Sequence, residues 1–430
     1  MRVAPSLAGL LAGRLRWALV FWMFLIGAVA YLDRVNISIA GQAIQKDFAL
    51  TNVQLGWVFS AFVIGYALFQ IPGGRLADRF GARMVIALGV VWWGIFTTLT
   101  ALVPMGMAGS VAMLIGTRFL LGLGEAVVYP SSNRLVSSWI PSSERGLANG
   151  LIFAGVGAGA GVTPPIIIFI LTHWGWHWSF YASALIGLAA GAVWFLMARD
   201  SPREHPLVSQ PEIAFIEAGL PATANEAGEV LPWRAIVGSR NVWAITFSYF
   251  TYGYVAYIFF TWFFIYLSRV RGLDLKSSAF YSMLPFIAMA CAAPLGGWLA
   301  DRITRHYGKR AGRCGVAMFG IALAGVFLAL ATQVASARVA SIVLAGGAGA
   351  LYLAQSAFWA VSADIAGKSA GTVSGLMNMG AQIGGAVTAA LTPWIADHFG
   401  WTASFIVAAG WCVAGSLAWL FVRPETPIRK

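Results

Sequence analysis

The sequence is poor in charge and in cysteine. Only 10% of its 430 residues are Asp, Glu, Lys or Arg, whereas an ordinary soluble domain has about 25%. This scarcity excludes a soluble enzyme, a disordered chain and a nucleic-acid-binding domain. Three cysteines give neither a disulfide framework nor a metal-ligand spacing. We expect Cys291, Cys314 and Cys412 to pack as small apolar side chains.

Long apolar runs dominate the sequence instead, since 59% of the residues are hydrophobic. A helix needs about 20 apolar residues to cross the hydrocarbon layer of a membrane. Twelve segments meet this requirement, and they predict an all-α polytopic membrane protein with twelve transmembrane helices. The segments are residues 17–40, 53–74, 84–104, 109–133, 147–171, 178–198, 242–268, 278–300, 314–333, 338–363, 370–396 and 401–422.

A single long polar interval separates the first six segments from the last six. It contains five prolines and no segment long enough to cross a membrane. We therefore predict an N-terminal six-helix bundle in residues 1–198 and a cytoplasmic linker in residues 199–241. A C-terminal six-helix bundle with a short cytoplasmic tail follows in residues 242–430.

The net charge of +12 comes from basic residues on one side of this predicted topology. With the N-terminus inside, 21 Lys and Arg residues lie in inner segments, 5 lie in outer loops, and the remaining two lie within helices. Membrane proteins carry such an excess on their cytoplasmic side. We expect a multi-pass protein of the inner (plasma) membrane with both termini in the cytoplasm. The lipid bilayer, and not nucleic acid, is the partner that this basic side faces.

The two halves repeat each other in sequence. Gly73–Arg79 recurs as Gly296–Arg302 with six identities in seven residues, and the His173–Phe180 segment matches His398–Phe405 at nearly the same offset. This repeat predicts two bundles related by a pseudo-two-fold axis. Carriers built from such repeats bind substrate near the midplane and rock their halves about that site.

At this stage the motifs resemble a known family. Gly74–Arg83, between the second and third segments, is similar to the signature loop of the major facilitator superfamily. Tyr31–Asn36, Ser60–Tyr66 and Arg118–Ala126 resemble the anion:cation symporters, which include bacterial sugar-acid (galactonate-type) carriers and the sialin group. The resemblance implies the major facilitator fold and a secondary transporter of organic anions.

Four ionisable side chains lie well inside the predicted helices: Asp33, Arg34, Arg118 and Glu125. A charge at the centre of an inserted helix costs about 2.5 to 3.5 kcal/mol, so we expect these four to share a water-accessible site. Arg118 and Glu125 are seven residues apart, which places them on one helix face. Two structural ion pairs between helices 1 and 4 are the alternative.

An anion that competes for an arginine leaves the carboxylate beside it without its partner, so that this carboxylate protonates more readily. The resemblance implies that Arg34 and Tyr66 contact the substrate carboxylate. It further implies that Asp33 and Glu125 serve proton coupling and that Arg118 is the switchable partner of an acid. The expected coupling ion is H⁺, although a carboxylate can also serve sodium.

Two positions depart from the family pattern. Leu121 occupies the place where the sialin-like members have a second acid. Val156 replaces a glutamine of the galactonate-type carriers, which leaves the particular sugar acid open.

The C-terminal half offers neutral polar groups. Ser356 and Trp359 lie on the tenth segment, and Asn378 and Gln382 share one face of the eleventh. We predict that they bind the hydroxyl groups of the substrate. Hydrogen bonding between helices, without a ligand, is the alternative for each of them.

A further set of charges lies at the predicted inner surface. The resemblance implies that they form a latch that breaks when the carrier opens inward, while charges that only set topology are the alternative. These gating residues are Asp78, Arg79, Arg83, Asp301 and Arg302.

Together these features predict proton-coupled uptake of a small organic anion, a sugar acid or related carboxylate, by rocker-switch alternating access. We expect no catalytic residues, no cofactor, no metal and a monomer. A phosphate/organophosphate antiporter is the main alternative, and it would exchange anions without a proton gradient. A membrane-embedded enzyme lacks a catalytic constellation in this sequence, and a channel would not concentrate substrate.

Overall fold

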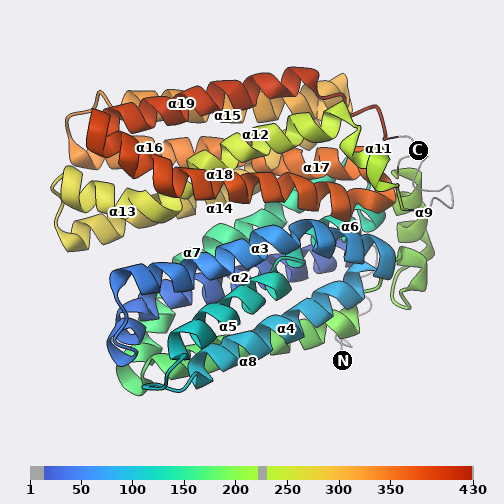
Figure 1. Cartoon of the computed structure of the whole chain (residues 1–430). Coiled ribbons are helices and arrows are strands. Elements are labelled where there is room, and N and C mark those ends of the chain that lie inside the picture. Colours follow the sequence, from blue (N-terminus) through green and yellow to red (C-terminus); the bar gives the residue numbers. More distant parts are fainter. Residues whose placement is uncertain (1–13, 221–229, 429–430) are drawn as a thin grey trace, which may run out of the picture.

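The computed structural model describes residues 14–220 and 230–428, and all regular elements in these ranges are helical (Figure 1). Residues 1–13 of the predicted N-terminal bundle, residues 221–229 of the predicted linker and residues 429–430 of the predicted tail lie outside the described residues.

The N-terminal half consists of seven helices that run back and forth. They are α2 (Leu15–Asp47), α3 (Asn52–Phe80), α4 (Ala82–Leu102), α5 (Ser110–Glu125), α6 (Val128–Trp139), α7 (Arg145–Trp174) and α8 (Trp176–Met197). The fourth predicted segment is therefore broken: α5 ends at Glu125, and α6 continues it well beyond the predicted end at residue 133.

The short helices of the predicted linker follow. They are η1 (Pro202–Glu204), α9 (Gln210–Ala218) and α11 (Trp233–Val237). The C-terminal half then contains α12 (Arg240–Tyr257), η2 (Ile258–Trp262), α13 (Phe263–Ile265), η3 (Tyr266–Val270), α14 (Leu275–Lys309), η4 (Arg310–Gly315), α15 (Val316–Ala331), α16 (Ala337–Leu353), α17 (Gln355–Ala366), η5 (Gly367–Ser369), α18 (Ala370–Phe399), α19 (Trp401–Ala418) and η6 (Trp419–Phe421).

Ten stretches of the described chain are long and apolar enough to cross a membrane. Two of them, Phe280–Ala331 and Ala337–Phe399, have 52 and 63 residues. One crossing takes about 20 residues, so each of these two is long enough for two crossings. Gly308 and Gly367 interrupt them with φ angles of +86° and +52°. The predicted twelve-helix, all-α fold is therefore confirmed.

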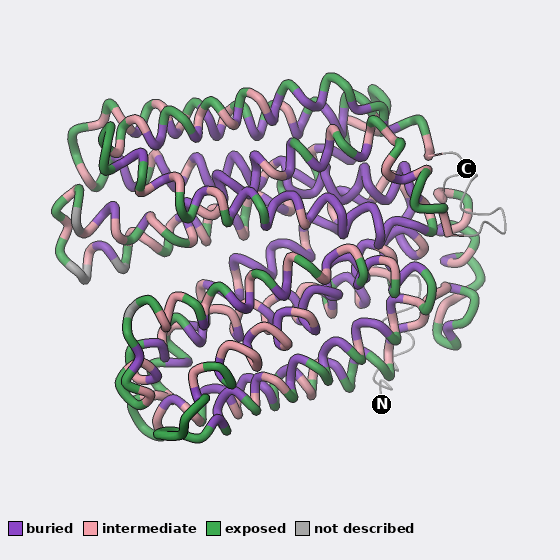
Figure 2. The backbone as a smooth tube through the Cα atoms, in the orientation of Figure 1, coloured by how far each residue is buried: buried purple, intermediate pink, exposed green. Residues whose placement is uncertain are grey.

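Exposed residues lie on the outside of the helices, and buried residues lie between the helices (Figure 2). Many of the exposed residues are large and apolar. Leu185 and Leu196 are 70% and 72% exposed, which is unfavourable in water but suits a surface that faces lipid. The expectation for the cysteines is confirmed for Cys314 and Cys412, which are buried, and is wrong for Cys291, which is exposed. An apolar thiol on the outside of α14 faces lipid at little cost.

The sequence repeat reappears as a structural repeat. Gly175 lies between α7 and α8, and Gly400 lies between α18 and α19. Their φ angles are +86° and +85°, a region in which glycine is favoured because it lacks a Cβ atom. Equivalent helices of the two halves therefore turn at equivalent glycines.

The halves meet most extensively along two helix pairs, α7 with α14 and α3 with α18, and also where α6 and α7 contact α17 and α18. The backbones approach very closely here. A Cβ atom on Gly74 would collide with the carbonyl oxygen of Gly371, and one on Gly297 would collide with that of Gly146. Small residues permit this close packing of helices in membranes. The ribbons of the halves converge towards the end that carries α9 and α11, here called the linker end (Figure 1).

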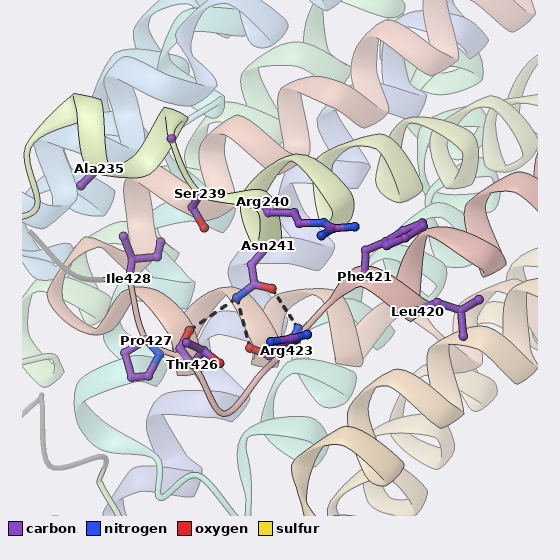
Figure 3. A pocket seen from close by; sticks show the side chains of 11 residues that line it. Ala235, Ser239, Arg240, Asn241, Leu420, Phe421, Arg423, Thr426, Pro427 and Ile428 are labelled. Carbon is purple, nitrogen blue, oxygen red and sulfur yellow. Dashed lines mark hydrogen bonds between the residues drawn. The ribbon is translucent and has the colours of Figure 1, made fainter.

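At the linker end, the linker binds the start of α2 and the tail binds the start of α12. The Glu212 carboxylate on α9 accepts hydrogen bonds from the backbone amides of Leu15 and Arg16, both at 3.3 Å, at the start of α2. Asn241 exchanges hydrogen bonds with the backbone of Arg423 in the tail (Figure 3). Asn241 and Arg423 border a surface pocket at this end. The four charges predicted to lie inside the helices, Asp33, Arg34, Arg118 and Glu125, do not line this pocket. The domain boundaries at residues 198 and 242 remain predictions.

Candidate binding site between the two halves

The structure brings the four predicted buried charges together on two neighbouring helices of one half. Asp33 and Arg34 lie on α2, and Arg118 and Glu125 lie on α5. Asp33, Arg118 and Glu125 are at most 2% exposed. Arg34 Nε donates to Glu125 Oε1 at 2.5 Å, and the Arg34 side chain keeps 13% of its surface accessible. Arg34 is thus the member of the cluster that has access to space beyond it.

The other two charges make no such pair. Asp33 Oδ2 accepts a hydrogen bond from Thr97 Oγ1 of α4 at 2.6 Å, whereas its Oδ1 has no partner. Nε and Nη1 of Arg118 and Oε2 of Glu125 are also buried without a partner. Within the described residues, the four charges therefore form one direct ion pair, not the two that a purely structural cluster would have.

Aromatic rings surround the guanidinium of Arg34. Its Cζ lies 4.1 Å from the ring centroid of Tyr66, 4.8 Å from that of Tyr31 and 5.3 Å from that of Phe62. Rings at these distances attract the cation through their π faces. The predicted neighbours Arg34 and Tyr66 thus lie in contact. Arg34 Nη2 is buried without a hydrogen-bond partner, so Glu125 does not satisfy all donors of this guanidinium.

A cavity lies next to Arg34, between the two halves. Seventeen residues line it, and four of the predicted site residues, Arg34, Tyr66, Asn378 and Gln382, are among them. Asp33, Arg118, Glu125, Ser356 and Trp359 are not. The lining residues are Tyr31, Arg34, Tyr66, Tyr129, Phe153, Val156, Tyr249, Tyr252, Gly253, Ala256, Tyr257, Phe260, Tyr352, Gln355, Asn378, Ala381 and Gln382.

The polar groups of the C-terminal half are joined in a network beside this cavity. Tyr249 Oη accepts hydrogen bonds from Gln355 Nε2 at 2.8 Å and from Trp359 Nε1 at 3.0 Å. Tyr257 Oη donates to Gln382 Oε1 at 2.6 Å. Trp359 does not line the cavity itself, but its hydrogen bond holds the lining residue Tyr249 in place.

Two other predicted residues differ in their partners. Asn378 Nδ2 donates to Gln70 Oε1 of the other half at 2.9 Å, which is the hydrogen bonding between helices that the sequence left open. Ser356 Oγ is buried without a partner. Gln70 was not predicted from the sequence. It lies four residues after Tyr66 on the same helix face, and this spacing marks it as a polar group near the site.

The predicted latch contains two carboxylates that reach across to the other half. Asp78 of α3 accepts hydrogen bonds from the backbone amides of Gly371 and Thr372, at 2.8 and 2.7 Å, where α18 begins. Asp301 of α14 does the same for Gly146 and Leu147, at 2.9 and 2.7 Å, where α7 begins. The free amides and the positive end of a helix dipole favour a carboxylate at this position. We call these contacts the two aspartate caps.

The three arginines predicted for the latch make no hydrogen bond or ion pair with the other half in the described part of the chain. Arg83 Nε donates to the carbonyl oxygen of Phe195 at 2.9 Å. Arg79 is exposed beside Phe80, and Arg302 is exposed beside Trp298. Their part in gating remains a prediction.

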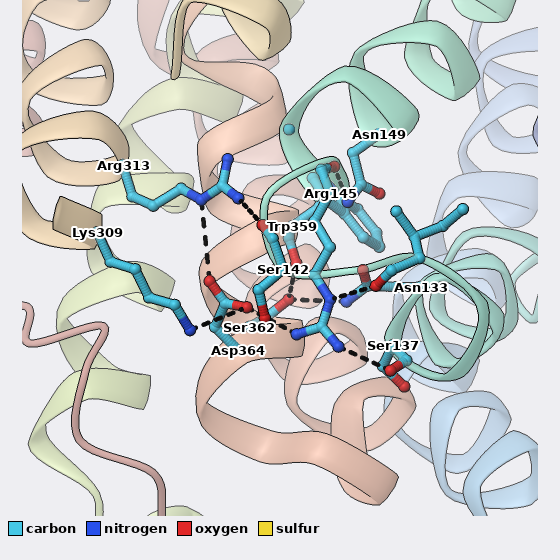
Figure 4. Close-up of polar contacts among 12 residues, drawn as sticks. Asn133, Ser137, Ser142, Arg145, Asn149, Lys309, Arg313, Trp359, Ser362 and Asp364 are labelled. Atoms are coloured by element: carbon cyan, nitrogen blue, oxygen red, sulfur yellow. Dashed lines mark hydrogen bonds and ion pairs between the residues drawn. The ribbon is translucent and has the colours of Figure 1, made fainter. Parts of the chain in front are cut away.

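Buried ion pairs that sequence analysis missed accompany the caps at the linker end (Figure 4). Arg145 Nη1 lies 2.7 Å from Asp364 Oδ1 of the other half, and Arg313 Nη1 lies 2.6 Å from Asp301 Oδ1. Lys309 Nζ also approaches Asp364, at 3.5 Å. Arg145 and Arg313 are completely buried. Both lie just before predicted apolar segments, among the basic residues counted on the inner side.

The relationships of the chain to known proteins agree with this geometry. The family model of the Major Facilitator Superfamily matches residues 23–389 and 306–430. The chain is 36% identical over 404 residues to the "Probable sulfoacetate transporter SauU" of Cupriavidus necator, covering 94% of this chain and 92% of that one. It is 32% identical over 411 residues to the "Hexuronate transporter" of Bacillus subtilis, covering 94% of each.

A third relative is the "D-galactonate transporter" of Escherichia coli, with 31% identity over 308 residues that cover 68% of this chain and 69% of that one. Among solved structures, the proton:xylose symporter XylE bound to 6-bromo-6-deoxy-D-glucose matches with a TM-score of 0.77 and 16% identity. That match covers 96% of this chain and 97% of that one. At this identity the likeness concerns the fold.

Proposed function

Since this chain belongs to the Major Facilitator Superfamily and is a membrane transporter and not an enzyme, we propose that it takes up a small organic anion together with protons. The anion is a sugar acid or a related carboxylate, the class named for the hexuronate and galactonate relatives. Orientation follows the basic residues, so the linker end faces the cytoplasm.

The observation that carries this proposal is the position of Arg34 between the cavity and Glu125. Arg34 lines the cavity and forms the ion pair with Glu125. An anion in the cavity therefore competes with Glu125 for the same guanidinium. A buried carboxylate that loses its cation is unfavourable unless it takes up a proton. Binding of the anion thus favours binding of a proton, and the two enter together.

Arg118 and Asp33 complete this exchange. Arg118 interacts electrostatically with both Asp33 and Glu125, yet none of its nitrogens forms an ion pair with either carboxylate in the described chain. When a proton neutralises Glu125, the attraction of Arg118 for Asp33 is left unopposed. We assign Arg118 the role of the switchable partner and Asp33 that of the second acid.

Alternating access requires that the contacts between the halves break and form again. In the described chain, the hydrogen bonds that join the halves are found from the linker end up to the level of the Gln70–Asn378 pair. This arrangement corresponds to a carrier that is closed at its linker end. Opening towards the cytoplasm would break the two aspartate caps and the Arg145–Asp364 pair.

Uptake into proteoliposomes tests the proposal. Labelled galactonate and glucuronate are offered with an inward proton gradient, which an ionophore then collapses, and protein-free liposomes serve as the control. We expect accumulation of a carboxylate that disappears with the gradient. Exchange that does not depend on the proton gradient and that requires phosphate inside the liposomes would instead favour the antiporter.

A further inference from the structure

The charges of the residues that line the cavity define the class of substrate more narrowly than the proposed function does. This inference rests on that proposed function. Among the seventeen lining residues, Arg34 is the single cationic side chain, and there is no carboxylate. The cavity itself therefore offers one positive charge, at its N-terminal wall.

The remaining walls are neutral and largely aromatic. Seven tyrosines and two phenylalanines line the cavity, together with the amides of Gln355, Asn378 and Gln382. Tyr129 and Tyr252 belong to opposite halves, and the hydroxyl of Tyr129 is buried without a hydrogen-bond partner. These groups can donate to neutral oxygens, and the rings can pack on the carbon skeleton of a ligand.

Among the described residues, no other buried arginine supplies a second charge to this space. Arg118 lies behind the wall, with its Cζ 5.0 Å from the ring centroid of Phe62, and does not line the cavity. Arg145 and Arg313 are engaged by Asp364 and Asp301 in the network at the linker end. A second anionic group on a ligand would lie among neutral side chains.

We propose that the substrate is a monoanion, with one carboxylate at Arg34 and a neutral body that carries hydroxyl groups or a ring. Its carboxylate contacts the guanidinium of Arg34, and its body lies between the tyrosines of the two halves. Dicarboxylates are disfavoured because burying a charge without a partner is far more costly than burying a hydroxyl group. This discriminates between ligands that the relatives' names alone would all allow.

Galactonate and galactarate make the matched pair that tests the inference, because they differ only in whether C6 is a hydroxymethyl group or a carboxylate. Their apparent affinities are measured by competition with labelled substrate in proteoliposomes and by ligand-induced thermal stabilisation of the purified protein. At pH 7.5 both acid groups of galactarate are ionised. We expect galactarate to bind at least about tenfold more weakly than galactonate.

A gain of charge provides the complementary test. Gln382 lines the cavity from α18 of the C-terminal half, whereas Arg34 lines it from α2 of the N-terminal half. Gln382→Arg places a second cation there, while Gln382→Met has a similar length without the charge and serves as its matched control. Both lose the hydrogen bond from Tyr257. We expect only the arginine variant to raise the affinity for galactarate relative to galactonate.

The outcomes separate this inference from the proposed function. Equal affinities of the wild-type protein for the two acids, or an unchanged ratio in Gln382→Arg, would overturn the monoanion assignment while transport of carboxylates stands. If no carboxylate of a panel of monoacids and diacids is bound or transported, the proposed function fails and the monoanion assignment fails with it.

Discussion

Arg34 forms the ion pair with Glu125 and lines the cavity, so its replacement tests the proposed anion site. In Arg34→Ala the cavity loses its single cation, and Glu125 loses its ion-pair partner. We expect binding of the anion to weaken at least about a hundredfold, since a hydrogen bond to a charged group contributes about 1.5 to 3 kcal/mol and the ion pairing adds to it. Thermal stabilisation by ligand measures the loss.

The conservative variant Arg34→Lys is the control for this experiment. It keeps the charge but not the planar group that lies against Tyr31 and Tyr66, so partial affinity should return. Undiminished affinity in Arg34→Ala would remove Arg34 from the substrate site.

Glu125→Gln tests the coupling. Glutamine resembles the protonated acid in shape and hydrogen bonding, so the variant is fixed in the state that the substrate favours. We expect accumulation driven by a proton gradient to fall at least about tenfold, while exchange of labelled for unlabelled substrate persists. Gradient-driven uptake at the wild-type level would shift the coupling role to Asp33.

At the residue scale, the sequence predicted which charges are buried but not how they pair. Asp33, Arg34, Arg118 and Glu125 stand out because charge is costly in a transmembrane helix. Their pairing depends on the rotation of each helix and on side-chain rotamers, and Thr97, which binds Asp33, carries no signal of its own. The tyrosines of the cavity are equally hard to single out in a sequence rich in aromatic residues.

Helix ends of the two halves meet at the linker end, where Asp301 caps the start of α7. Asp301→Asn weakens the hydrogen bonds to Gly146 and Leu147 and the ion pair with Arg313. Loss of a helix cap costs about 0.5 to 2 kcal/mol, and about 1.4 kcal/mol changes an equilibrium tenfold. We expect the population open at the linker end to increase about tenfold, with little change in substrate affinity for each conformation.

Distances between spin labels measure this shift. Phe80 on α3 and Tyr307 on α14 are exposed positions near the linker end, and they are labelled as cysteines in a variant without the exposed Cys291. Asp397→Asn, an exposed acid near the far end of α18, is the matched control. A distance distribution that is identical in Asp301→Asn and in this control would contradict the latch.

Elements were predicted well where apolar length decides them and less well where a break occurs inside an apolar run. Twelve crossings follow from the lengths of the runs alone. The interruption between α5 and α6, directly after Glu125, was not predicted, because the surrounding residues remain apolar and small. Helix ends such as Trp139 extend beyond the apolar segments, since polar residues continue a helix outside the membrane.

On the scale of the whole molecule, the linker crosses from one half to the other. The backbone of Leu231 accepts a hydrogen bond from Arg75 Nη1 of α3 at 2.7 Å and donates one to Ser369 Oγ at 2.8 Å, just before α18. The two halves are thus joined through one residue beside the Asp78 cap. Separation of the halves at the linker end must break one of these bonds.

Ser369→Ala removes the C-terminal attachment of this bridge. We expect a smaller opening than in Asp301→Asn, about a fivefold increase in the open population, since one neutral hydrogen bond contributes about 0.5 to 1.5 kcal/mol. The same pair of spin labels measures it, with Ser336→Ala at the opposite end of the molecule as the control. A closed population equal to that of the wild-type protein would show that Leu231 does not restrain the halves.

The sequence repeat anticipated the arrangement of the halves but not the contacts between them. Repeated segments predict that two similar bundles face each other, and the caps at Asp78 and Asp301 occupy equivalent places. Arg145 and Asp364 have no counterpart pair in the other half, because the repeat has diverged at both positions. Such unique contacts cannot be read from internal similarity.

The two aspartate caps have a consequence for how the molecule is assembled. Each half contributes one carboxylate and receives another at the start of one of its own helices, so the two surfaces are self-complementary. This is the isologous geometry of a symmetric homodimer, in which one patch binds its own copy. Each half therefore carries both partners of this contact, and two separately synthesised halves are expected to match each other at the caps.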